Sequence, residues 1–196
     1  MNKNFYNLVA IDEVGRGAIA GPLVVGGLMI DKTVIKVLRK HKIYFFDSKL
    51  LTQQQRLYFV SLIKKYKLPY KTYSVNNQII DKYGIQNAFT KAIIKIYNYF
   101  QPQILLIDGL KIKNLHLKNA FYYTKGDQRF CSIAGASILA KVKRDRYMIN
   151  LAKKYPFYAF EKNKGYGTKE HYCLLQRWGI SKIHRLSFLK NFKIEI

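Results

Sequence analysis

The sequence predicts a mixed α/β domain in which helices cover a central β-sheet. Short apolar runs typical of strands come first along the chain, and later strands alternate with helical patterns. No internal repeat or low-complexity linker divides the 196 residues, so one compact unit is expected. Hydrophobic residues make up 49% of the chain and aromatic residues 15%, which indicates a packed core rather than disorder.

The first half of the chain contains three strand patterns and one helix. YNLVAID (6–12) and GPLVVGGLMI (21–30) are apolar runs bounded by glycine, and both predict strands. The stretch 47–66 indicates a loop followed by a helix, for which Thr52 is a suitable N-cap. PYKTYSV (69–75) alternates between polar and apolar residues, as a half-buried strand does.

The middle of the chain continues this alternation. NAFTKAIIKIYNYF (87–100) is an amphipathic helix that ends before Pro102. QILLIDG (103–109) is an unbroken apolar run of the kind found in buried parallel strands. AFYYTKGD (120–127) is a further run that ends in an acid beside a glycine. These runs complete the predicted sheet.

The last third is mainly helical. Residues 132–155 predict a long helix with small residues in its first turns and basic residues in its later turns. NKGYGT (163–168) is a glycine-flanked loop, and KEHYCLLQRWG (169–179) predicts a short final helix.

The charge of the chain favours a polyanionic partner. Lysine and arginine number 35 against 11 acidic residues, giving a formal net charge of +24. Neutralising phosphates releases condensed counterions, so nucleic acid is the favoured partner, although anionic membrane surfaces and AT-biased coding also explain basic chains. No run is long enough to cross a membrane, and no secretory signal is evident, so no membrane association is expected.

The cysteines indicate neither a disulfide framework nor a zinc site. Cys131 and Cys173 are far apart and lack a Cys-x-x-Cys spacing. His171 lies two residues before Cys173, but two possible ligands do not make a tetrahedral site, and packing or surface roles suit both better. A reduced, cytoplasmic protein is therefore expected.

Four of the few acidic residues follow apolar runs and lie beside glycines. They are Asp12, Glu13, Asp108 and Asp127. Ligand sites in open α/β sheets gather at strand ends, so these carboxylates are expected to converge. Converging carboxylates in a partly buried site repel unless a cation compensates, and Mg²⁺ or Mn²⁺ suits oxygen ligands best. A single strand-end aspartate is usually a cap or turn residue, but four such acids favour a shared metal site.

Two of these acids pose a geometric problem. Adjacent residues in a regular strand point to opposite faces, so Asp12 and Glu13 cannot both reach one site from a pleated strand. We expect the strand to end at Asp12, with Glu13 contributing from the turn by its side chain or its carbonyl.

Two glycine-flanked steps suggest contact with a sugar or phosphate. Gly15 and Gly17 leave the backbone bare for close approach, with the charge of Arg16 nearby, although a tight turn with a solvated arginine also explains the step. Tyr166 between two glycines could stack on a base or contact a ribose, although tyrosines more often serve packing.

Taken together, these stretches resemble ribonuclease HII. The motifs occur in the order of that family from about residue 9 to residue 188: DEVGRG, AGP, DSK, LIDG, KGD, SIAGASILAKVKRDR, KGYGT and HRLSF. The resemblance implies the RNase H fold, with a catalytic domain over residues 1–155 and a small helical C-terminal extension over 156–196 packed on it. It also implies a Mg²⁺- or Mn²⁺-dependent endonuclease, acting as a monomer on RNA–DNA hybrids and on duplex DNA that holds single ribonucleotides. Family members incise on the 5′ side of such a ribonucleotide and leave 5′-phosphate and 3′-hydroxyl ends.

The resemblance also implies roles for individual residues. Asp12, Glu13, Asp108 and Asp127 match the family's catalytic and metal-binding acids, the four already selected. Residues 15–17 (Gly15, Arg16 and Gly17) match the loop whose backbone reads the ribose 2′-hydroxyl. Tyr166 matches the tyrosine at the DNA–RNA junction. Ser48 and Lys49 fall in the DSK stretch, where Lys49 is expected to contact a phosphate.

A few features depart from the family or stay open. FFDSKLL lacks the usual asparagine and second lysine, and Gly135 stands where alanine is common. Asp145 is interpreted as an ion-pair residue or as one that supports the metal ligands, rather than as a metal ligand itself. The C-terminal FLKNFKIEI (188–196) indicates a basic tail packed on the domain and does not identify a sliding-clamp partner.

Two other functions were weighed. A ribonuclease HIII-like enzyme would act on hybrids but poorly on single ribonucleotides. That relative carries an extra N-terminal binding domain and lacks the Gly-Arg-Gly step, and only 11 residues precede the first acid here. A non-catalytic basic nucleic-acid-binding protein would have a broken carboxylate set, and this set is intact.

Overall fold

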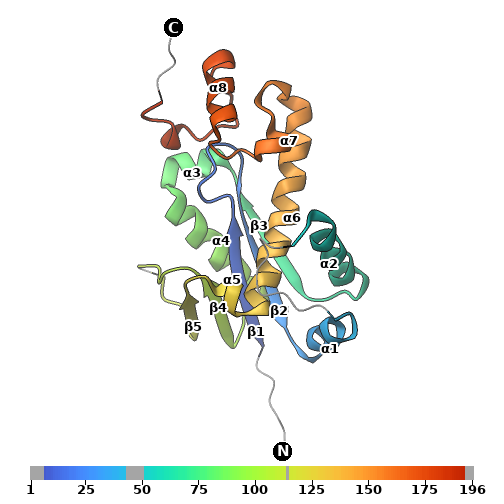
Figure 1. Cartoon of the computed structure of the whole chain (residues 1–196). Helices are drawn as coiled ribbons and strands as arrows, with labels where there is room; N and C mark the ends of the chain where they lie inside the picture. The colour runs from blue at the N-terminus through green and yellow to red at the C-terminus, as the bar shows by residue number, and fades with distance from the viewer. Residues whose placement is uncertain (1–6, 43–50, 114, 193–196) are drawn as a thin grey trace, which may run out of the picture.

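A computed structural model describes residues 7–42, 51–113 and 115–192 of the chain. Its centre is a five-stranded mixed sheet in the order β3-β2-β1-β4-β5 (Figure 1). The strands are β1 Leu8–Val14, β2 Leu23–Ile30, β3 Tyr70–Val75, β4 Ile104–Asp108 and β5 Ala120–Tyr123. The pairs β1–β2 and β2–β3 are antiparallel, whereas β1–β4 and β4–β5 are parallel. The predicted α/β class is confirmed.

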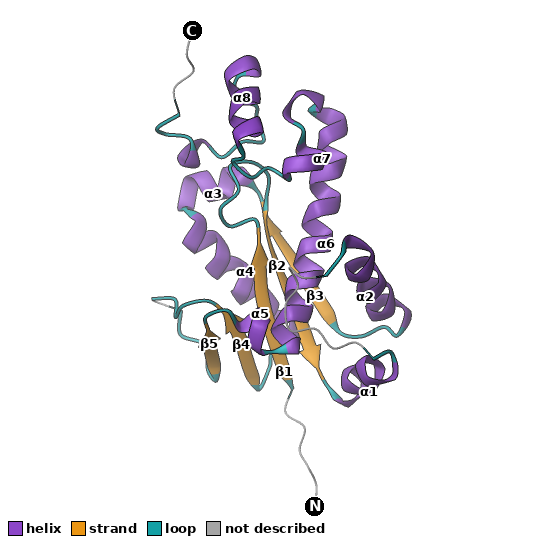
Figure 2. Cartoon of the chain, in the orientation of Figure 1, coloured by secondary structure: helices purple, strands orange, loops and turns teal. Residues whose placement is uncertain are grey.

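Helices cover both faces of this sheet (Figure 2). They are α1 Lys32–Lys40, α2 Gln53–Lys65, α3 Asn77–Tyr83, α4 Ile85–Phe100, α5 Gly126–Arg129, α6 Cys131–Lys154, α7 Phe160–Asn163 and α8 Lys169–Trp178. Two 3₁₀ turns, Pro156–Tyr158 and Leu186–Phe188, complete the C-terminal part. None of the helices within these described ranges combines the length and apolar character that crossing a membrane requires.

The alternation of β1 divides its side chains between two cores. Val9 and Ile11 pack with the apolar stripe of α4, which buries Phe89, Ile93 and Ile96. Ala10 faces the other way and packs with Leu106 and Ile133 at the start of α6. Odd-numbered residues of β1 therefore face α4, and even-numbered residues face α6.

Helix α6 lies directly on the sheet because small residues line the contact. A Cβ added at Gly26 of β2 would lie 2.2 Å from the carbonyl oxygen of Ala136. Ala134, Ala136 and Ser137 are buried in the first half of the helix, and its last turn is basic. The predicted long helix is confirmed to within one residue at each end.

The C-terminal segments pack on the loop between β1 and β2. Ile19 of that loop joins a core with Met148 of α6, Phe160 of α7 and Leu175 of α8. Backbone hydrogen bonds join the same segments, including Arg185 N–H to the Ile19 carbonyl at 2.7 Å. The division of the chain at residue 155 stays a prediction.

Several elements differ from the sequence prediction. Strand β1 does not end at Asp12 but continues to Val14, with Glu13 paired to Val25 of β2. The run 120–127 is strand only to Tyr123, because Lys125 takes a left-handed conformation (φ 54°) and the chain enters α5. Helices α1 and α3 were not predicted.

Candidate active site

Asp12 lies on the face of β1 that α6 covers, and only 5% of it is exposed. Its Oδ1 accepts the backbone N–H of Glu13 at 2.7 Å, and its side chain is hydrogen-bonded to Ser137 of α6. Burial raises the pKa of Asp12 well above its usual range, and the negative charges of Glu13 and Asp108 raise it further. The chain thus holds this carboxylate among other acids where a cation would relieve the repulsion.

Glu13 leaves the strand on the opposite face, toward α4. Its Oε1 forms an ion pair with Arg16 Nη1 at 3.2 Å, while its buried Oε2 has no hydrogen-bond partner among the described residues. Burial raises the pKa of Glu13, Arg16 opposes that rise, and the charge of Asp108 adds to it. The expectation that Glu13 contributes from a turn after the strand is therefore wrong, because β1 keeps its pairing through this residue.

Asp108 ends the neighbouring parallel strand β4. It follows Ile107, which is paired with Ile11, so Asp108 stands level with Asp12 on the sheet. Its Oδ1 accepts the N–H of Gly126 at 2.6 Å, which ties the first turn of α5 to the end of β4. The parallel pairing of β1 and β4 brings Asp108 beside Asp12. The apolar run 103–109 predicted a parallel strand but not its neighbour or its register.

Asp127 is the second residue of α5, and 3% of it is exposed. It does not end a strand as expected, but the bond between Gly126 and Asp108 holds its helix beside β4. The structure therefore brings Asp12, Glu13 and Asp108 within electrostatic reach of one another and places Asp127 next to them in the chain and fold.

As the side chains stand, the described part of the chain gathers no group of three histidine, cysteine, aspartate or glutamate residues that could hold a metal ion. The donors nevertheless suit a hard divalent cation, because all are carboxylates and one buried oxygen of Glu13 has no hydrogen bond. Arg16 supplies the compensating charge at Glu13.

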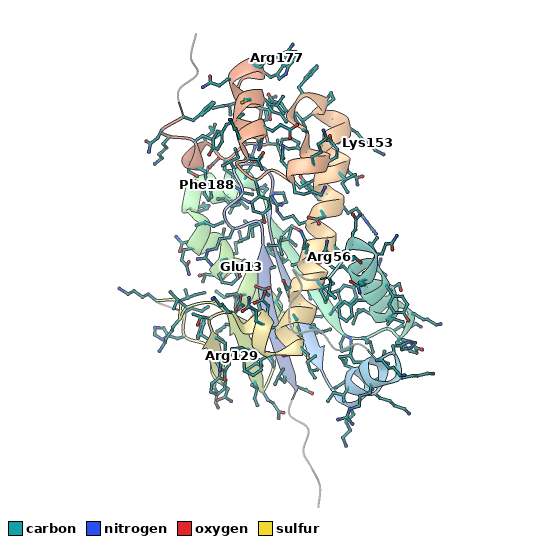
Figure 3. The ribbon with its side chains drawn as sticks, viewed as in Figure 1. Glu13, Arg56, Arg129, Lys153, Arg177 and Phe188 are labelled. Carbon is teal, nitrogen blue, oxygen red and sulfur yellow. The ribbon has the colours of Figure 1, made fainter. Side chains whose placement is uncertain are left out.

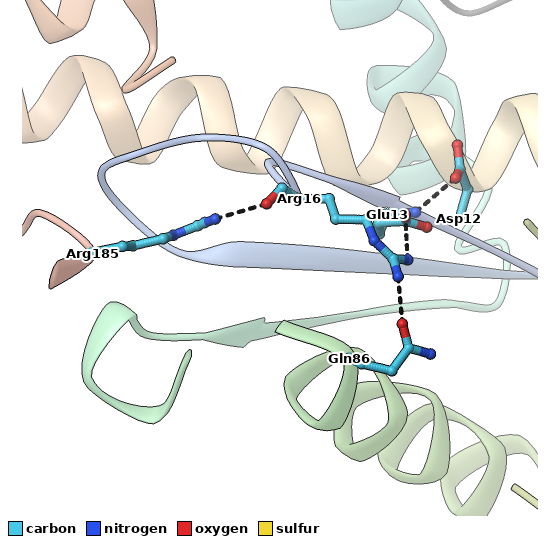
Figure 4. A network of polar contacts seen from close by, with 5 residues as sticks. All are labelled: Asp12, Glu13, Arg16, Gln86 and Arg185. Atoms are coloured by element: carbon cyan, nitrogen blue, oxygen red, sulfur yellow. Dashed lines mark hydrogen bonds and ion pairs between the residues drawn. The ribbon is translucent and has the colours of Figure 1, made fainter. Parts of the chain in front are cut away.

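Residues 15–17 follow β1 directly, and each is held differently. Gly15 has φ +90°, and a Cβ there would lie 2.0 Å from Nε of Arg144, whereas a Cβ on Gly17 would meet nothing within 4 Å. The Arg16 guanidinium bonds Glu13 and Gln86 of α4, and Arg185 Nη1 donates to the Arg16 carbonyl at 3.0 Å (Figure 4). Arg16 thus points back to the acids.

Tyr166 lies beside this loop, as Ala18 and Tyr166 form an antiparallel bridge. The Tyr166 ring lies over the guanidinium of Arg144, with 5.1 Å from Cζ to the ring centroid, and 37% of the residue is exposed. The two glycine-flanked steps selected from the sequence are therefore neighbours in space. Ser48 and Lys49 lie outside the described residues.

Sequence reasoning did not assign two buried arginines that support these loops. Arg144 donates to the carbonyls of Pro22, Lys164 and Ala20, and Arg185 donates to those of Gly21 and Arg16. They lie in the motifs KVKRDR and HRLSF; Arg144 stands among other charged residues, so no local pattern in the sequence indicates that it is buried. Asp145 forms an ion pair with Lys141 at 3.1 Å, one of the two roles expected of it.

Figure 3 shows Glu13 in the middle of the molecule, with Arg129, Lys153 and Arg177 farther out. The formal net charge of +24 suits the chain to attracting a polyanion.

Comparisons with known proteins agree with these motifs. The family model of Ribonuclease HII matches residues 9–191. Ribonuclease HII of Caldicellulosiruptor bescii is 42% identical over 194 residues, covering 97% of this chain and 90% of that protein.

Solved structures share the fold. The structure of the PCNA:RNase HII complex from Archaeoglobus fulgidus has a TM-score of 0.76 at 23% identity, covering 97% of this chain and 96% of that chain. Bst-RNase HIII, solved in complex with Mn²⁺, has a TM-score of 0.65 at 16% identity, covering 93% and 64%. The family match spans nearly the whole chain, and the chain belongs to the ribonuclease HII family.

Proposed function

We propose that this ribonuclease, besides cutting the RNA strand of RNA–DNA hybrids, incises duplex DNA on the 5′ side of a single embedded ribonucleotide. The family membership supports an RNase H-type nuclease acting on hybrids. The finer activity is our proposal, as are the monomeric state and cytoplasmic location expected from the sequence.

One observation carries the proposal: buried acids are held close enough together near the ends of β1 and β4 to raise one another's pKa. Burial and mutual repulsion raise the pKa of both Asp12 and Glu13, and the second oxygen of Glu13 lacks a hydrogen bond. We propose that Asp12, Asp108 and Asp127 hold two divalent ions, Mg²⁺ or Mn²⁺, together with Glu13. Because the Glu13 side chain leaves β1 on the other face, Glu13 would contribute by its backbone carbonyl or by its carboxylate oxygen that has no hydrogen bond. When bound, such ions lower the pKa of a water and offset charge on the leaving oxygen of a phosphodiester.

The other proposed residues would position the substrate while the phosphodiester is hydrolysed. The water oxygen would form a bond to phosphorus and give up a proton as the bond from phosphorus to the 3′ oxygen breaks, and the 3′ oxygen would take up a proton to become a hydroxyl, leaving the phosphate on the 5′ end. The backbone of residues 15–17 lies open at Gly17 for contact with the ribose 2′-hydroxyl. Tyr166, exposed beside that loop, would pack at the DNA–RNA junction. Ser48 and Lys49 keep their proposed contact with the nucleic-acid backbone.

Asp12→Asn tests the carboxylate assignment. The amide keeps the shape of the side chain but removes its charge, so Mg²⁺-dependent incision should fall by about 100-fold or more. Loss of a residue that only hydrogen-bonds a metal ligand already lowers activity by about 10- to 100-fold, and loss of the ligand's own charge should cost at least as much. Folding should be retained, because the variant removes a repelled buried charge. Gel-based incision rates and urea unfolding measure the two effects.

Asp145→Asn is the matched control. It changes a carboxylate on α6 that pairs with Lys141 and lies outside the proposed site. Breaking a partly exposed ion pair should cost less than about 1 kcal/mol, and incision should stay close to that of the unmodified chain. Full activity in Asp12→Asn, with intact folding, would contradict the assignment.

A further inference from the structure

We propose that His171 and His184 form a chain of hydrogen bonds with one fixed order of protons, and that this chain positions Tyr166 for discrimination at the DNA–RNA junction. The proposal rests on the proposed function of Tyr166. It makes both histidines positioning residues, since neither lies among the carboxylates. Both are fully or almost fully buried, with exposed fractions of 0% and 1%.

The contacts run in one line from the C-terminal segment to the Tyr166 loop. The backbone N–H of Ser181 donates to Nδ1 of His184 at 3.0 Å. Nε2 of His184 lies 3.1 Å from Nε2 of His171. Nδ1 of His171 lies 2.8 Å from the carbonyl oxygen of Tyr166.

The Tyr166 end of this line decides where each proton lies. Nδ1 of His184 contacts a donor, the Ser181 N–H at 3.0 Å, and more distantly an acceptor, the Ser181 carbonyl at 3.3 Å, so the Tyr166 carbonyl decides the order. That carbonyl can only accept, so His171 donates to it from Nδ1 and a neutral His184 carries its proton on Nε2. That proton then points at His171, whose Nε2 must accept it. His171 keeps its own proton on Nδ1, where the carbonyl of Tyr166 accepts it.

The opposite order fails at the Tyr166 end. A bare Nδ1 on His171 would face the lone pairs of the Tyr166 carbonyl. A proton on Nδ1 of His184 would exchange the 3.0 Å contact with the Ser181 N–H for the longer one, 3.3 Å, with the Ser181 carbonyl. A second proton on either ring would place two N–H groups against each other. Burial lowers the pKa of His171, and that of His184 to about 4, so both rings are neutral near pH 7.

The environment of the pair is built for neutral rings. Phe160 lies edge-on to His171 at 5.5 Å between ring centroids, and Tyr158 lies edge-on to His184 at 4.9 Å. Ser181 Oγ also contacts Nδ1 of His184 at 2.8 Å. Glu170 precedes His171 and is the acid whose charge acts on it.

The same line reaches the loop that follows β1. Ala20 forms an antiparallel bridge with His184, while Ala18 forms one with Tyr166. Gly165 accepts the N–H groups of Ile19 and Ala20 at 2.9 and 3.0 Å. His184 therefore contacts the loop that follows β1, and His171 contacts the carbonyl of Tyr166, the residue proposed to read the junction. The Tyr166 carbonyl also accepts the Thr168 N–H at 2.8 Å and the Tyr166 N–H donates to the Asn163 carbonyl at 3.0 Å, so His171 adds a side-chain contact to a backbone already held by its own loop.

Two substitutions of His171 separate the donor to Tyr166 from the rest of the ring. In His171→Asn the amide nitrogen can take the place of Nδ1 and still donate to the Tyr166 carbonyl. In His171→Gln the amide lies nearer the place of Nε2, so the contact with His184 can persist while the donor to Tyr166 is lost. The measurement is the ratio of the incision rate at a single ribonucleotide to the cleavage rate of an RNA–DNA hybrid.

His171→Gln should lower that ratio by about 10- to 100-fold, because a small misplacement of a positioning group can cost this much. The loss should fall on kcat rather than KM, and Tyr166→Ala gives the size of loss when the junction contact is absent. His171→Asn should restore most of the ratio. Equal ratios in His171→Gln and the unmodified enzyme would overturn the proposal, as would equal losses in the two His171 variants.

Nitrogen-15 NMR of the histidine rings tests the proton order in the unmodified enzyme and needs no activity. At pH 7 His171 should appear as the Nδ1–H tautomer and His184 as the Nε2–H tautomer. The reverse assignment, or a charged ring, would overturn the proposal. If the enzyme shows this tautomer pair but makes no incision at single ribonucleotides, the proposed function fails while the proton order stands.

Discussion

At the scale of single residues, Asp12 and Glu13 are consecutive but have different electrostatic surroundings. Asp12 faces α6 and accepts hydrogen bonds from Ser137 and from the Glu13 N–H. It forms no ion pair with any of the described residues. Glu13 faces α4, where Arg16 neutralises one of its oxygens. The pair is therefore asymmetric, and Arg16 is the group that a bound cation would have to compete with at Glu13.

Gly15 and Gly17 provide a matched test of the loop that joins these acids to the ribose contact. Gly15→Ala should destabilise the fold by about 1–3 kcal/mol, because the residue has φ +90° and its Cβ would overlap Arg144. Gly17→Ala should leave the free energy of unfolding within about 0.5 kcal/mol, since nothing lies within 4 Å. Urea unfolding checks both values.

Incision separates the roles of the same two glycines. If the bare backbone at Gly17 approaches the ribose, Gly17→Ala should lower the incision rate without a loss of stability. A stable Gly17→Ala variant with unchanged incision would contradict the proposed close approach, and a fully stable Gly15→Ala variant would contradict the packing of Arg144 beneath the loop.

The sequence identified which residues form the site better than it identified how they are held. Asp12, Asp108 and Tyr166 follow from strand ends and glycine steps, which are local patterns. The direction of Glu13 depends on Arg16 and Gln86, and Gln86 lies about 70 residues away in the chain. Such contacts leave no local periodic signal, so the sequence could not show that β1 continues through Glu13.

At the scale of elements, the contact between β2 and α6 sets the distance from Ser137 to Asp12. Gly26 lets the α6 backbone touch the sheet, and the small residues Ala134 and Ala136 keep that approach close. Ser137 is therefore positioned by packing along the whole helix as well as by its own hydrogen bond.

Gly26→Ala should push α6 away from the sheet. Its Cβ would lie 2.2 Å from a backbone carbonyl oxygen that cannot rotate away, so we expect a loss of about 1–3 kcal/mol in the free energy of unfolding. Incision should fall as well, because Ser137 moves with the helix. Calorimetry checks the stability, with Gly17→Ala as the sterically free control, and incision assays compare Gly26→Ala with the unmodified chain. A Gly26→Ala variant as stable as the unmodified chain would contradict the close packing.

Element prediction succeeded where the apolar pattern was long and failed where it was short. The sheet strands and α6 have sustained apolar runs. Helix α1 buries only Val34 and Val37, although Asp31 caps it by accepting the Val34 N–H at 2.7 Å. The predicted run 120–127 was cut short because the Asp108 contact with Gly126 stabilises a helical turn there, a tertiary effect.

At the scale of the whole molecule, the C-terminal segments act as a support for the substrate loops. Arg185 donates hydrogen bonds to the carbonyls of Arg16 and Gly21. Arg144 of α6 donates to the carbonyl of Ala20, in the loop after β1, and to that of Lys164, in the loop that carries Tyr166. These two cations serve the fold, so the net charge of +24 overstates the charge available to a polyanion. Composition alone could not separate them from surface lysines.

The buried histidines make stability depend on pH in a defined direction. Burial lowers the pKa of His184 to about 4 from an unfolded value near 6.5, so the unfolded chain binds more protons between these values. The contribution of His184 to stability is thus present in full above pH 6.5 and is lost as the pH falls toward 4, with a slope of up to about 1.4 kcal/mol per pH unit.

His184→Gln isolates this contribution from the carboxylates, whose raised pKa values act in the opposite direction. The difference in free energy of unfolding between the unmodified chain and His184→Gln should narrow from pH 7 to pH 4.5, because only the unmodified chain loses the contribution of His184 over this range. Urea titrations at several pH values measure it, and a difference that stays constant over this range would show that His184 is not held neutral.

The most direct test of the central claim is cleavage of three matched duplexes: all DNA, an RNA–DNA hybrid, and DNA with one ribonucleotide. We predict that the enzyme, with Mg²⁺ or Mn²⁺, cuts the hybrid and makes one incision 5′ of the single ribonucleotide, leaving a 3′-hydroxyl. It should leave the all-DNA duplex intact, and EDTA should abolish both cuts. Cleavage of the hybrid without incision at the single ribonucleotide, or cleavage that persists in EDTA, would contradict the account.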